Sequence, residues 1–581
     1  DEDAVTFQDR SFAIAGGHTW IINPSVTNVF TAGLSKSVNI FTPPTIPSFP
    51  NSFGAGGVLT APFPSLSYQD RNVFVPTFRD DVTWNVGTHN IQFGGSFKPI
   101  RQNPSLINDF NFVTLGIGGG TSQLAASLRP TNIANLNGAR TNYDAAFAYI
   151  LGRYAAISTN FVYDPSGTPS APGSGRQRSY AYNEYEFYVQ DNWRIRNDLT
   201  LNLGVRYHFY PPPYEVNGFQ GSQNLDFQEL INIRLQNAAN GVAGPTSEPF
   251  LSFNLSGKAN NRPDLYNADT NNFAPRLGFA YNPSFESGFL GALFGQRKTV
   301  IRGNASLVYD RVGGAITFIQ DQSNFVFDSN ATTQFGTANA VTSLLNDPRF
   351  TSINSLPIQN VAPSVARPST PNVVNGIPVG TRTSQTSFLV SKDFEIPYSY
   401  TFNFGMQREL PGNMIIDVSY VGRLGRKLFT QGDAAQIVNF RDAASGQFML
   451  DAFNAVQAQL QAGTAPGSVT RQPWIENQIN AAIPGACTAS FNCTAFVASN
   501  FTNLVIQGGT SDLVQQLYAN QFIRPNVGLS SQFATNRFST NQGTSTYHGM
   551  LVSLQKRFSK GFEFDLNYTW SHSIDNQSSI V

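Results

Sequence analysis

The pattern of apolar and polar positions is clearest between Arg178 and Tyr210, where side chains of the two kinds alternate along the chain. Side chains of a strand point alternately to the two faces of a sheet, so this alternation predicts two β-strands with one apolar and one polar face. The predicted tight turn between them is Arg196-Asn197-Asp198. In the second strand the apolar face is expected to carry Leu199, Leu201, Leu203, Val205, Tyr207 and Phe209.

The length of these strands separates a membrane sheet from a soluble one. A strand of about 12 residues that rises ~3.3 Å per residue and tilts by ~45° spans roughly 28 Å, close to the ~25 Å apolar band of an outer-membrane barrel. Strands of soluble proteins average only ~5–6 residues. The alternation therefore favours a transmembrane β-barrel.

Four further hairpins carry the same alternation, at residues 74–100, 273–310, 397–429 and 547–574. Three of them have short predicted turns, and only the connection 283–298 is long. Weaker strand-like segments occupy the N-terminal region, and the whole chain is expected to hold about 14 strands. The short turns are Asn85–Thr88, Pro411–Asn413 and Ser559–Gly561; the N-terminal segments are Val5–Ile14, His18–Ile22 and Val26–Leu34.

Charged residues interrupt the apolar rows at Asp191, Arg408 and Lys556, each within a few residues of a predicted tight turn. A basic residue on the lipid face costs ~2–4 kcal/mol at the bilayer midplane but only ~0–1 kcal/mol at the interface. This placement is expected of a membrane barrel whose turns lie at the interface.

Long segments separate the hairpins, and we expect loops at about 100–142, 211–271, 311–396 and 430–545. Short turns at one end and long loops at the other are typical of periplasmic turns and extracellular loops. The predicted fold class is all-β, an antiparallel transmembrane β-barrel with long extracellular loops that contain short helices. The loops are expected to hold one more strand, Tyr143–Tyr163, and helices at Phe227–Ala238, Phe448–Leu460 and Asp512–Ala519.

The composition agrees with a barrel. Charged residues make up 13% of the chain, about half the ~25% of a typical soluble domain. The chain has 37 basic and 37 acidic residues, so its net charge is zero and no basic surface for nucleic acid is indicated. No run of about 18 apolar residues is present, which argues against a transmembrane helix.

Two cysteines, Cys487 and Cys493, have five residues between them. This spacing permits a small disulfide loop in an oxidising compartment, which we favour, or two free thiols. The five histidines are scattered and form no zinc pattern. The N-terminal residues lack the basic start and apolar core of a signal peptide, so we expect a mature chain or a fragment.

The ordered series of hairpin motifs resembles a known family. The chain resembles the barrel of Oar-like TonB-dependent transporters, which are large outer-membrane proteins common in Acidobacteria-like genomes, over most of residues 70–575. The motifs that carry the resemblance are YVQDNWRIRNDLTLNLGVRYHFY, NNFAPRLGFAYNP, KTVIRGNASLVYDR, YTFNFGMQRELPGNMIIDVSYVGRLGRKL and YHGMLVSLQKRFSKGFEFDLNYTWSHSID.

The resemblance implies a barrel of about 22 strands in the Gram-negative outer membrane. It implies that extracellular loops bind a solute and that a plug then rearranges through the TonB complex. The implied partners are the lipid bilayer with lipopolysaccharide, the TonB complex through an N-terminal region, and an unknown extracellular ligand. No regulatory domain, plug, TonB box or final aromatic-ended strand is found in residues 1–581. We therefore expect a partial barrel from the middle of a longer chain.

No Ser/His/Asp constellation, metal-ligand pattern or cofactor motif stands out, so an enzyme is not predicted and no catalytic, cofactor or metal residue is assigned. Gly116–Thr121 lacks the Lys-Ser/Thr of a phosphate loop and is interpreted as a flexible loop. Neighbouring Asp80 and Asp81 are expected on opposite faces of a strand, which excludes a shared acid–base site. Candidate lumen-facing residues are Arg206, His208, Arg302 and Asn403, and candidate interface aromatics are Tyr207, Trp193 and Trp570.

Three functions remain open at this point. The first is energy-coupled solute uptake, the second a structural or adhesive role at the cell surface, and the third an unplugged porin. The loops show no distinctive chemistry from which a substrate follows.

Overall fold

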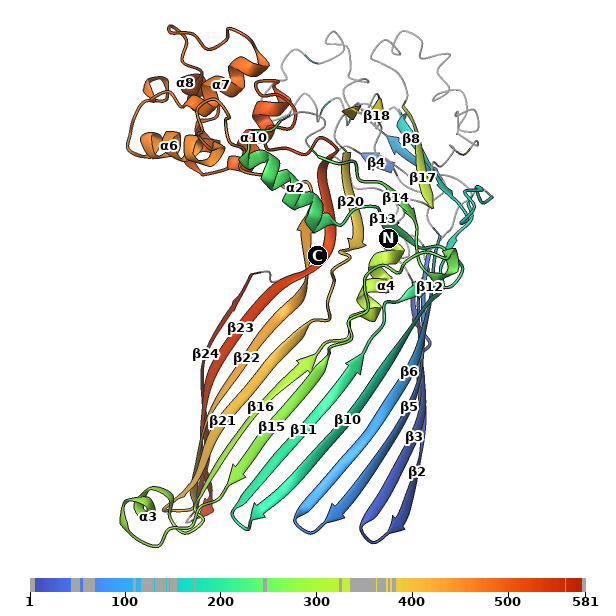
Figure 1. Cartoon of the computed structure of the whole chain (residues 1–581), viewed down its shortest axis with the longest axis vertical. Coiled ribbons are helices and arrows are strands. Elements are labelled where there is room, and N and C mark those ends of the chain that lie inside the picture. The colour runs from blue at the N-terminus through green and yellow to red at the C-terminus, as the bar shows by residue number, and fades with distance from the viewer. Residues whose placement is uncertain are drawn as a thin grey trace.

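The structure is a computed structural model in which a tall wall of tilted strands carries helices and short strands at one end (Figure 1). It describes residues 6–42, 53–55, 68–107, 111–115, 154–171, 173–243, 248–322, 327–334, 373–374, 377–378, 383–559 and 561–576, together with positions 130, 143, 146 and 362.

Twelve long strands pair in chain order into one antiparallel sheet. Each neighbouring pair is antiparallel, as the predicted hairpins require. The long strands are β2 (Phe12–Asn23), β3 (Val26–Thr42), β5 (Tyr68–Val86), β6 (His89–Ile107), β10 (Tyr180–Arg196), β11 (Leu199–Phe209), β15 (Phe273–Tyr281), β16 (Thr299–Tyr309), β21 (Tyr398–Leu410), β22 (Met414–Asp433), β23 (Phe533–Ser559) and β24 (Phe562–Asp575).

Shorter strands and helices lie mostly at the long-loop end (Figure 1). Four short strands bring the main sheet to sixteen strands: β1 (Thr6–Asp9), β9 (Arg176–Gln177), β12 (Tyr214–Glu215) and β20 (Thr383–Val390). The separate strands are β4 (Phe53–Ala55), β7 (Asn111–Leu115), β8 (Tyr154–Val162), β13 (Gly221–Gln223), β14 (Phe253–Leu255), β17 (Asp328–Gln334), β18 (Val373–Val374) and β19 (Ile377–Pro378). The helices are α2 (Phe227–Ala239), α3 (Gly288–Phe294), α4 (Gly313–Gln322), α6 (Met449–Gln461), α7 (Pro473–Ala482), α8 (Cys493–Asn500), α9 (Thr502–Ile506) and α10 (Thr510–Ala519), with 3₁₀ turns Lys258–Asn260 and Pro466–Ser468.

The strand register places the apolar rows of the twelve strands on one face of the sheet. Val189 pairs with Phe93 on one side and with Val205 on the other, so apolar side chains meet apolar side chains across strands. These side chains are exposed rather than buried between two layers; Trp570 is 68% and Leu566 61% exposed. The prediction of an apolar face turned outward is confirmed, and such a face matches the lipid-facing side of a barrel.

The three charged residues on the apolar face each have a partner near a turn. The Nδ1 of His89 lies 2.6 Å from a carboxylate oxygen of Asp191. The Nη2 of Arg408 donates to the Ala292 carbonyl at 2.7 Å. The Nζ of Lys556 donates to the Gly412 carbonyl at 3.0 Å. Each charged side chain therefore has at least one polar partner on a face that is otherwise apolar.

The opposite face of the sheet is polar. The side chains of Asp80 and Asp81 lie on different faces, as the sequence predicted. On the polar face, Asp81 accepts a hydrogen bond from the Tyr188 hydroxyl at 2.6 Å. On the apolar face, Asp80 accepts one from the Asn28 amide at 2.7 Å. The period of two along β5 therefore excludes a shared carboxylate site.

Several predicted boundaries are wrong because the strands continue past the expected membrane band. The loop expected at 430–545 covers only 434–532, since β22 extends to Asp433 and β23 starts at Phe533. The loop expected from residue 100 begins after β6 ends at Ile107. The predicted break between the N-terminal segments Val5–Ile14 and His18–Ile22 is also wrong. Strand β2 continues through Gly16 and Gly17 without interruption. The loop expected at 311–396 holds β20, which pairs in parallel with β23.

The predicted strand Tyr143–Tyr163 is wrong at its start. Tyr143 and Ala146 are helical, and the strand begins only at Tyr154. The three predicted helices are confirmed as α2, α6 and α10. The Gly116–Thr121 segment lies outside the described residues. Among the helices described, none combines the length and apolarity needed to cross a membrane.

Candidate functional site

The polar face carries a network of charges where β10 and β11 approach the long-loop end. Arg206 donates through Nη1 to Glu186 at 2.8 Å and lies over the Tyr188 ring, 4.7 Å from its centroid. Glu186 also accepts a hydrogen bond from the Tyr210 hydroxyl at 2.8 Å. Arg206 thus lies on the polar face, as expected, but it is held in an ion pair with Glu186.

His208 lies in the same network. Its Nδ1 is 2.8 Å from the Tyr210 hydroxyl and 3.9 Å from a Glu186 oxygen. The residue is only 7% exposed. A buried imidazole between a phenol and a carboxylate holds the local structure, and it offers little surface to a passing solute.

Arg302 and Asn403 lie further toward the short turns, on the polar faces of neighbouring strands. Arg302 donates to Asp417 at 2.6 Å and remains half exposed. Asn403 pairs in register with Asn304 on the next strand. Of the four candidate lumen-facing residues, Arg206 and His208 therefore lie in one network, and Arg302 and Asn403 lie outside it.

Helix α4 covers the polar face near the long-loop end of the sheet. The Thr317 hydroxyl donates to the Gln102 side chain of β6 at 2.6 Å. The Tyr182 ring of β10 lies against Gly313 at the start of the helix. A small hydrophobic core forms behind α4; it contains Tyr210, Leu265, Tyr266, Val312, Ile316, Ile319, Val390, Phe394 and Ile396. The outer part of the polar face is therefore covered by packed protein.

Beyond this core a crevice of about 490 Å³ opens between β13, β14 and the segment 262–267. We call it the outer crevice. Ten of its fourteen lining residues have aliphatic hydroxyl, amide or charged side chains: Ser222, Gln223, Asn224, Ser252, Asn254, Ser256, Arg262, Asp264, Asn267 and Lys392, with Leu255, Pro263, Leu265 and Tyr266 as the others.

Two lining residues have polar groups inside the wall of the outer crevice. Ser256 is 2% exposed, and its hydroxyl has no hydrogen-bond partner within the described residues. Burial and the nearby carboxylates of Asp264 and Asp269 raise the pKa of Tyr266, so its phenol stays neutral. A volume of this size with many neutral donors and acceptors suits a small polar ligand.

Buried carboxylates join the outer loops into one assembly. Glu248 forms an ion pair with Arg234 of α2 at 2.9 Å, and both side chains are almost fully buried. The other oxygen of Glu248 accepts hydrogen bonds from the Ser530 hydroxyl and from the Ser531 backbone, at 2.8 and 2.7 Å. The contact joins loop 211–271 to the end of loop 434–532.

A second carboxylate makes a similar junction. Asp226 caps helix α2 by accepting from the Gln228 backbone at 2.8 Å. It also accepts from the Lys392 backbone at 2.6 Å and from the Ser391 hydroxyl at 2.9 Å. Residues 391–392 follow β20 and belong to a third loop. The Asp226 side chain therefore links this third loop to loop 211–271, which Glu248 joins to loop 434–532.

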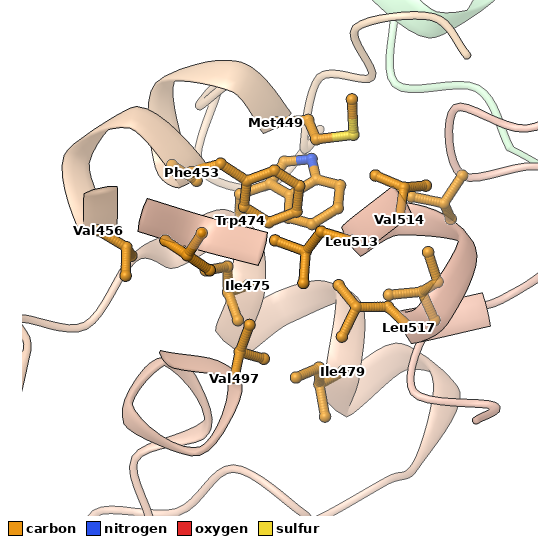
Figure 2. Close-up of a cluster of buried hydrophobic side chains, with 14 of the residues drawn as sticks. Met449, Phe453, Val456, Trp474, Ile475, Ile479, Val497, Leu513, Val514 and Leu517 are labelled. Carbon is orange, nitrogen blue, oxygen red and sulfur yellow. The ribbon is translucent and has the colours of Figure 1, made fainter. Parts of the chain in front are cut away.

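The loop 434–532 folds into a helical module with its own core. Trp474 is fully buried, its Nε1 donates to the Phe440 carbonyl at 2.9 Å, and the Phe453 ring meets it edge-on. Figure 2 shows side chains from α6, α7, α8 and α10 converging around it: Met449, Val456, Ile475, Ile479, Val497, Leu513, Val514 and Leu517.

Cys487 and Cys493 form a disulfide in this module, with their Cα atoms 5.5 Å apart. Glu476 lies close to both sulfur atoms, and this trio is the only metal-like grouping of His, Cys, Asp and Glu within the described residues. A disulfide leaves no thiolate to bind a metal ion, so the trio is not a fitting site in this state.

The sequence did not reveal the outer crevice, Glu248 or Asp226. One local signal was present: Asp226 directly precedes the predicted helix Phe227–Ala238, and aspartate is a preferred N-cap residue. Nothing local indicates that Asp226 also bonds to residues 391–392, because that contact depends on chain segments more than 160 residues apart.

Taken together, long antiparallel strands, an apolar outer face, short turns at one end and long loops at the other define the wall of an outer-membrane β-barrel. The chain belongs to the outer membrane beta barrel domain family, whose model matches residues 2–581. It is therefore a protein of the outer membrane and not an enzyme, as the sequence predicted. No curated protein matches the sequence.

Solved outer-membrane structures show a low similarity to this chain. One is the outer membrane transporter YddB from Escherichia coli, with 10% identity, a TM-score of 0.41 and coverage of 98% of this chain and 42% of that one. Another is the siderophore receptor PiuA from Acinetobacter baumannii, with 9% identity, a TM-score of 0.35 and coverage of 98% and 48%. The chain thus spans less than half the length of these structures.

Proposed function

We propose that this chain forms part of an Oar-like, TonB-dependent uptake receptor for a solute that binds at the outer loops. The observation that carries the proposal is the interlocked outer assembly. Buried carboxylates hold three loops together, and the outer crevice is lined by residues of loop 211–271 and by Lys392 of the loop that follows β20. A simple open pore has no use for such a built binding surface, whereas a receptor needs one.

The edges of the sheet support a larger barrel around this part. Within the described residues, β2 pairs only with β3, and β24 pairs only with β23. An unpaired strand edge in hydrocarbon leaves backbone groups unsatisfied at several kcal/mol each. We propose that further strands close the sheet toward about 22 strands, the plugged-transporter class. The genomic sequence on either side is the test, and we expect it to encode a plug and further strands.

Uptake is tested by deleting the whole gene and comparing growth on single nutrients. We expect loss of growth on one class of nutrient, restored by the intact gene and abolished again when TonB is removed or the proton gradient is collapsed. Uptake that persists without TonB would support an open porin. Unchanged growth together with lost surface attachment would support an adhesive protein.

The outer crevice is tested on the same nutrient. Asn254→Leu removes a central amide from the crevice wall, and we expect slower uptake at limiting nutrient with normal amounts of folded protein. The matched control is Gln236→Leu, an exposed position of α2 outside the crevice. Equal uptake by both variants would show that the outer crevice has no role in uptake of this nutrient.

A further inference from the structure

One connection at the short-turn end differs from the tight turns beside it, because residues 283–298 contain helix α3 (Figure 1). The helix starts after Ser287 and ends at Phe294, and the next residue, Gly295, has a positive φ of 67°, which glycine adopts without strain. A bridge between Ser284 and Gln296 closes the base of the connection. The segment is therefore an ordered projection.

Helix α3 presents large apolar side chains to its surroundings. Phe289 is 79% exposed, Leu290 44% and Leu293 42%. Residues three and four apart share a helix face, so Leu293 lies beside both other side chains. Removing such side chains from water is favourable in proportion to the apolar area that becomes buried. The exposed apolar cluster needs an apolar environment.

The structure fixes on which side of the sheet this cluster lies. Arg408 and Thr299 pair in register on the apolar face. Arg408 donates through Nη2 to the Ala292 carbonyl at 2.7 Å, and the Thr299 hydroxyl donates to the Phe294 carbonyl at 2.9 Å. Both groups thus hold α3 against the same face that carries the lipid-facing rows.

Basic residues follow the helix at the end of the connection. Arg297 and Lys298 are exposed, and the Lys298 carbonyl accepts from the Glu409 backbone at 2.9 Å. Glu286 precedes the helix, so the basic side chains lie on its C-terminal side only. A short apolar helix with basic side chains next to it is a pattern of segments that lie in the membrane interface. There, long cationic side chains reach the phospholipid headgroups while the apolar side chains reach the acyl chains.

We propose that α3 is an interfacial anchor that inserts Phe289, Leu290 and Leu293 into the periplasmic leaflet of the outer membrane. The occupant of this surface is phospholipid, because the cluster continues the lipid-facing side of the sheet. Three side chains also fall well short of the ~800 Å² per partner of a stable protein interface. The anchor fixes the depth of β15, β16 and β21 in the bilayer, and it stands independently of the proposed uptake function.

The test places an environment-sensitive NBD label on Phe289→Cys in the whole chain, reconstituted in phosphatidylethanolamine–phosphatidylglycerol nanodiscs. We expect a blue-shifted emission, strong quenching by lipids that carry a nitroxide near the headgroup–acyl boundary, and weak quenching by iodide. The matched control is Asn197→Cys, an exposed position in the β10–β11 turn at the same end. Its label is expected to be quenched by iodide.

Equal iodide quenching at residues 289 and 197 would overturn the proposal, because α3 would then lie in water. A label at 289 shielded from both quenchers would also overturn it, since another protein would cover the helix. If Phe289→Cys does not fold, Leu290→Cys provides the same measurement from the same face.

Discussion

The ring of Phe402 on β21 lies over the backbone of Gly422 on β22, in the space that a side chain at residue 422 would occupy. The two residues pair directly on the apolar face. Gly303 and Phe279 repeat the arrangement on β16 and β15. An aromatic ring over a strand glycine covers exposed backbone and fixes the register.

We therefore expect Gly422→Val to destabilise the sheet by about 1–3 kcal/mol, as overpacking does. Gly16→Val is the matched control, because Gly16 is on the same face of β2 with open space around it. Unboiled gel mobility during heating measures the loss of the folded form. The double variant Phe402→Ala/Gly422→Val is expected to recover part of the loss, and a Gly16→Val effect of equal size would refute the role of the ring.

The buried ion pair between Arg234 and Glu248 should dominate the cohesion of the outer loops. Removing one partner of a buried pair costs about 3–5 kcal/mol, because the other charge stays buried and uncompensated. We expect Glu248→Ala to release the helical module to limited proteolysis while the strands remain resistant. Lys258→Ala is the control; its ion pair with Asp264 is exposed and long, at 3.9 Å, and such pairs contribute ~0–1 kcal/mol.

The disulfide should stabilise the helical module modestly, because it closes a short loop. The chain-entropy relation gives about 2 kcal/mol for a loop of roughly seven residues. We expect Cys487→Ser/Cys493→Ser to lower the urea midpoint for proteolytic cleavage within the loop 434–532. Thiol alkylation of the unfolded wild-type chain without reductant tests the bond itself, and labelled cysteines there would mean that the thiols are free.

Asp442 should make the helical module sensitive to acid. The residue is 4% exposed. Burial by itself would raise its pKa, but hydrogen bonds from Ser445, Asn477 and Gln478 outweigh burial and lower the pKa below 3.8. A lowered pKa in the folded state means that the stabilisation is complete above the unfolded value and is lost as the pH falls through the folded value.

The module should therefore lose stability on acidification below about pH 4, near the unfolded pKa of an aspartate. In Asp442→Asn this part of the pH dependence should be absent, at the cost of lower stability at neutral pH. Urea unfolding of the module at a series of pH values measures both effects. Parallel pH curves for the two proteins would show that another group is responsible.

The order of amino acids along the chain is enough to predict the wall of the barrel. A side-chain period of two fixes which residues share a face, and a tight turn fixes the register of the strands beside it, so Val189, Val205 and Phe93 could be placed on one apolar face without coordinates. The same repeating pattern predicted the outer-membrane location, and the match of the family model to residues 2–581 shows the family. The charged residues near the turns were also placed correctly, because the local position along a strand sets their depth.

The assembly of the loops, in contrast, became visible only in the folded chain. Arg234 meets Glu248 and the Ser530 region, and Asp226 meets Ser391, through segments that are far apart in sequence and have no shared period. The position of α3 against Arg408 could not be predicted from the sequence either, because it depends on a hydrogen bond between residues 116 positions apart. Periodicity reports the environment of each residue along one element, whereas a hydrogen bond between distant loops depends on the shape that the whole chain adopts.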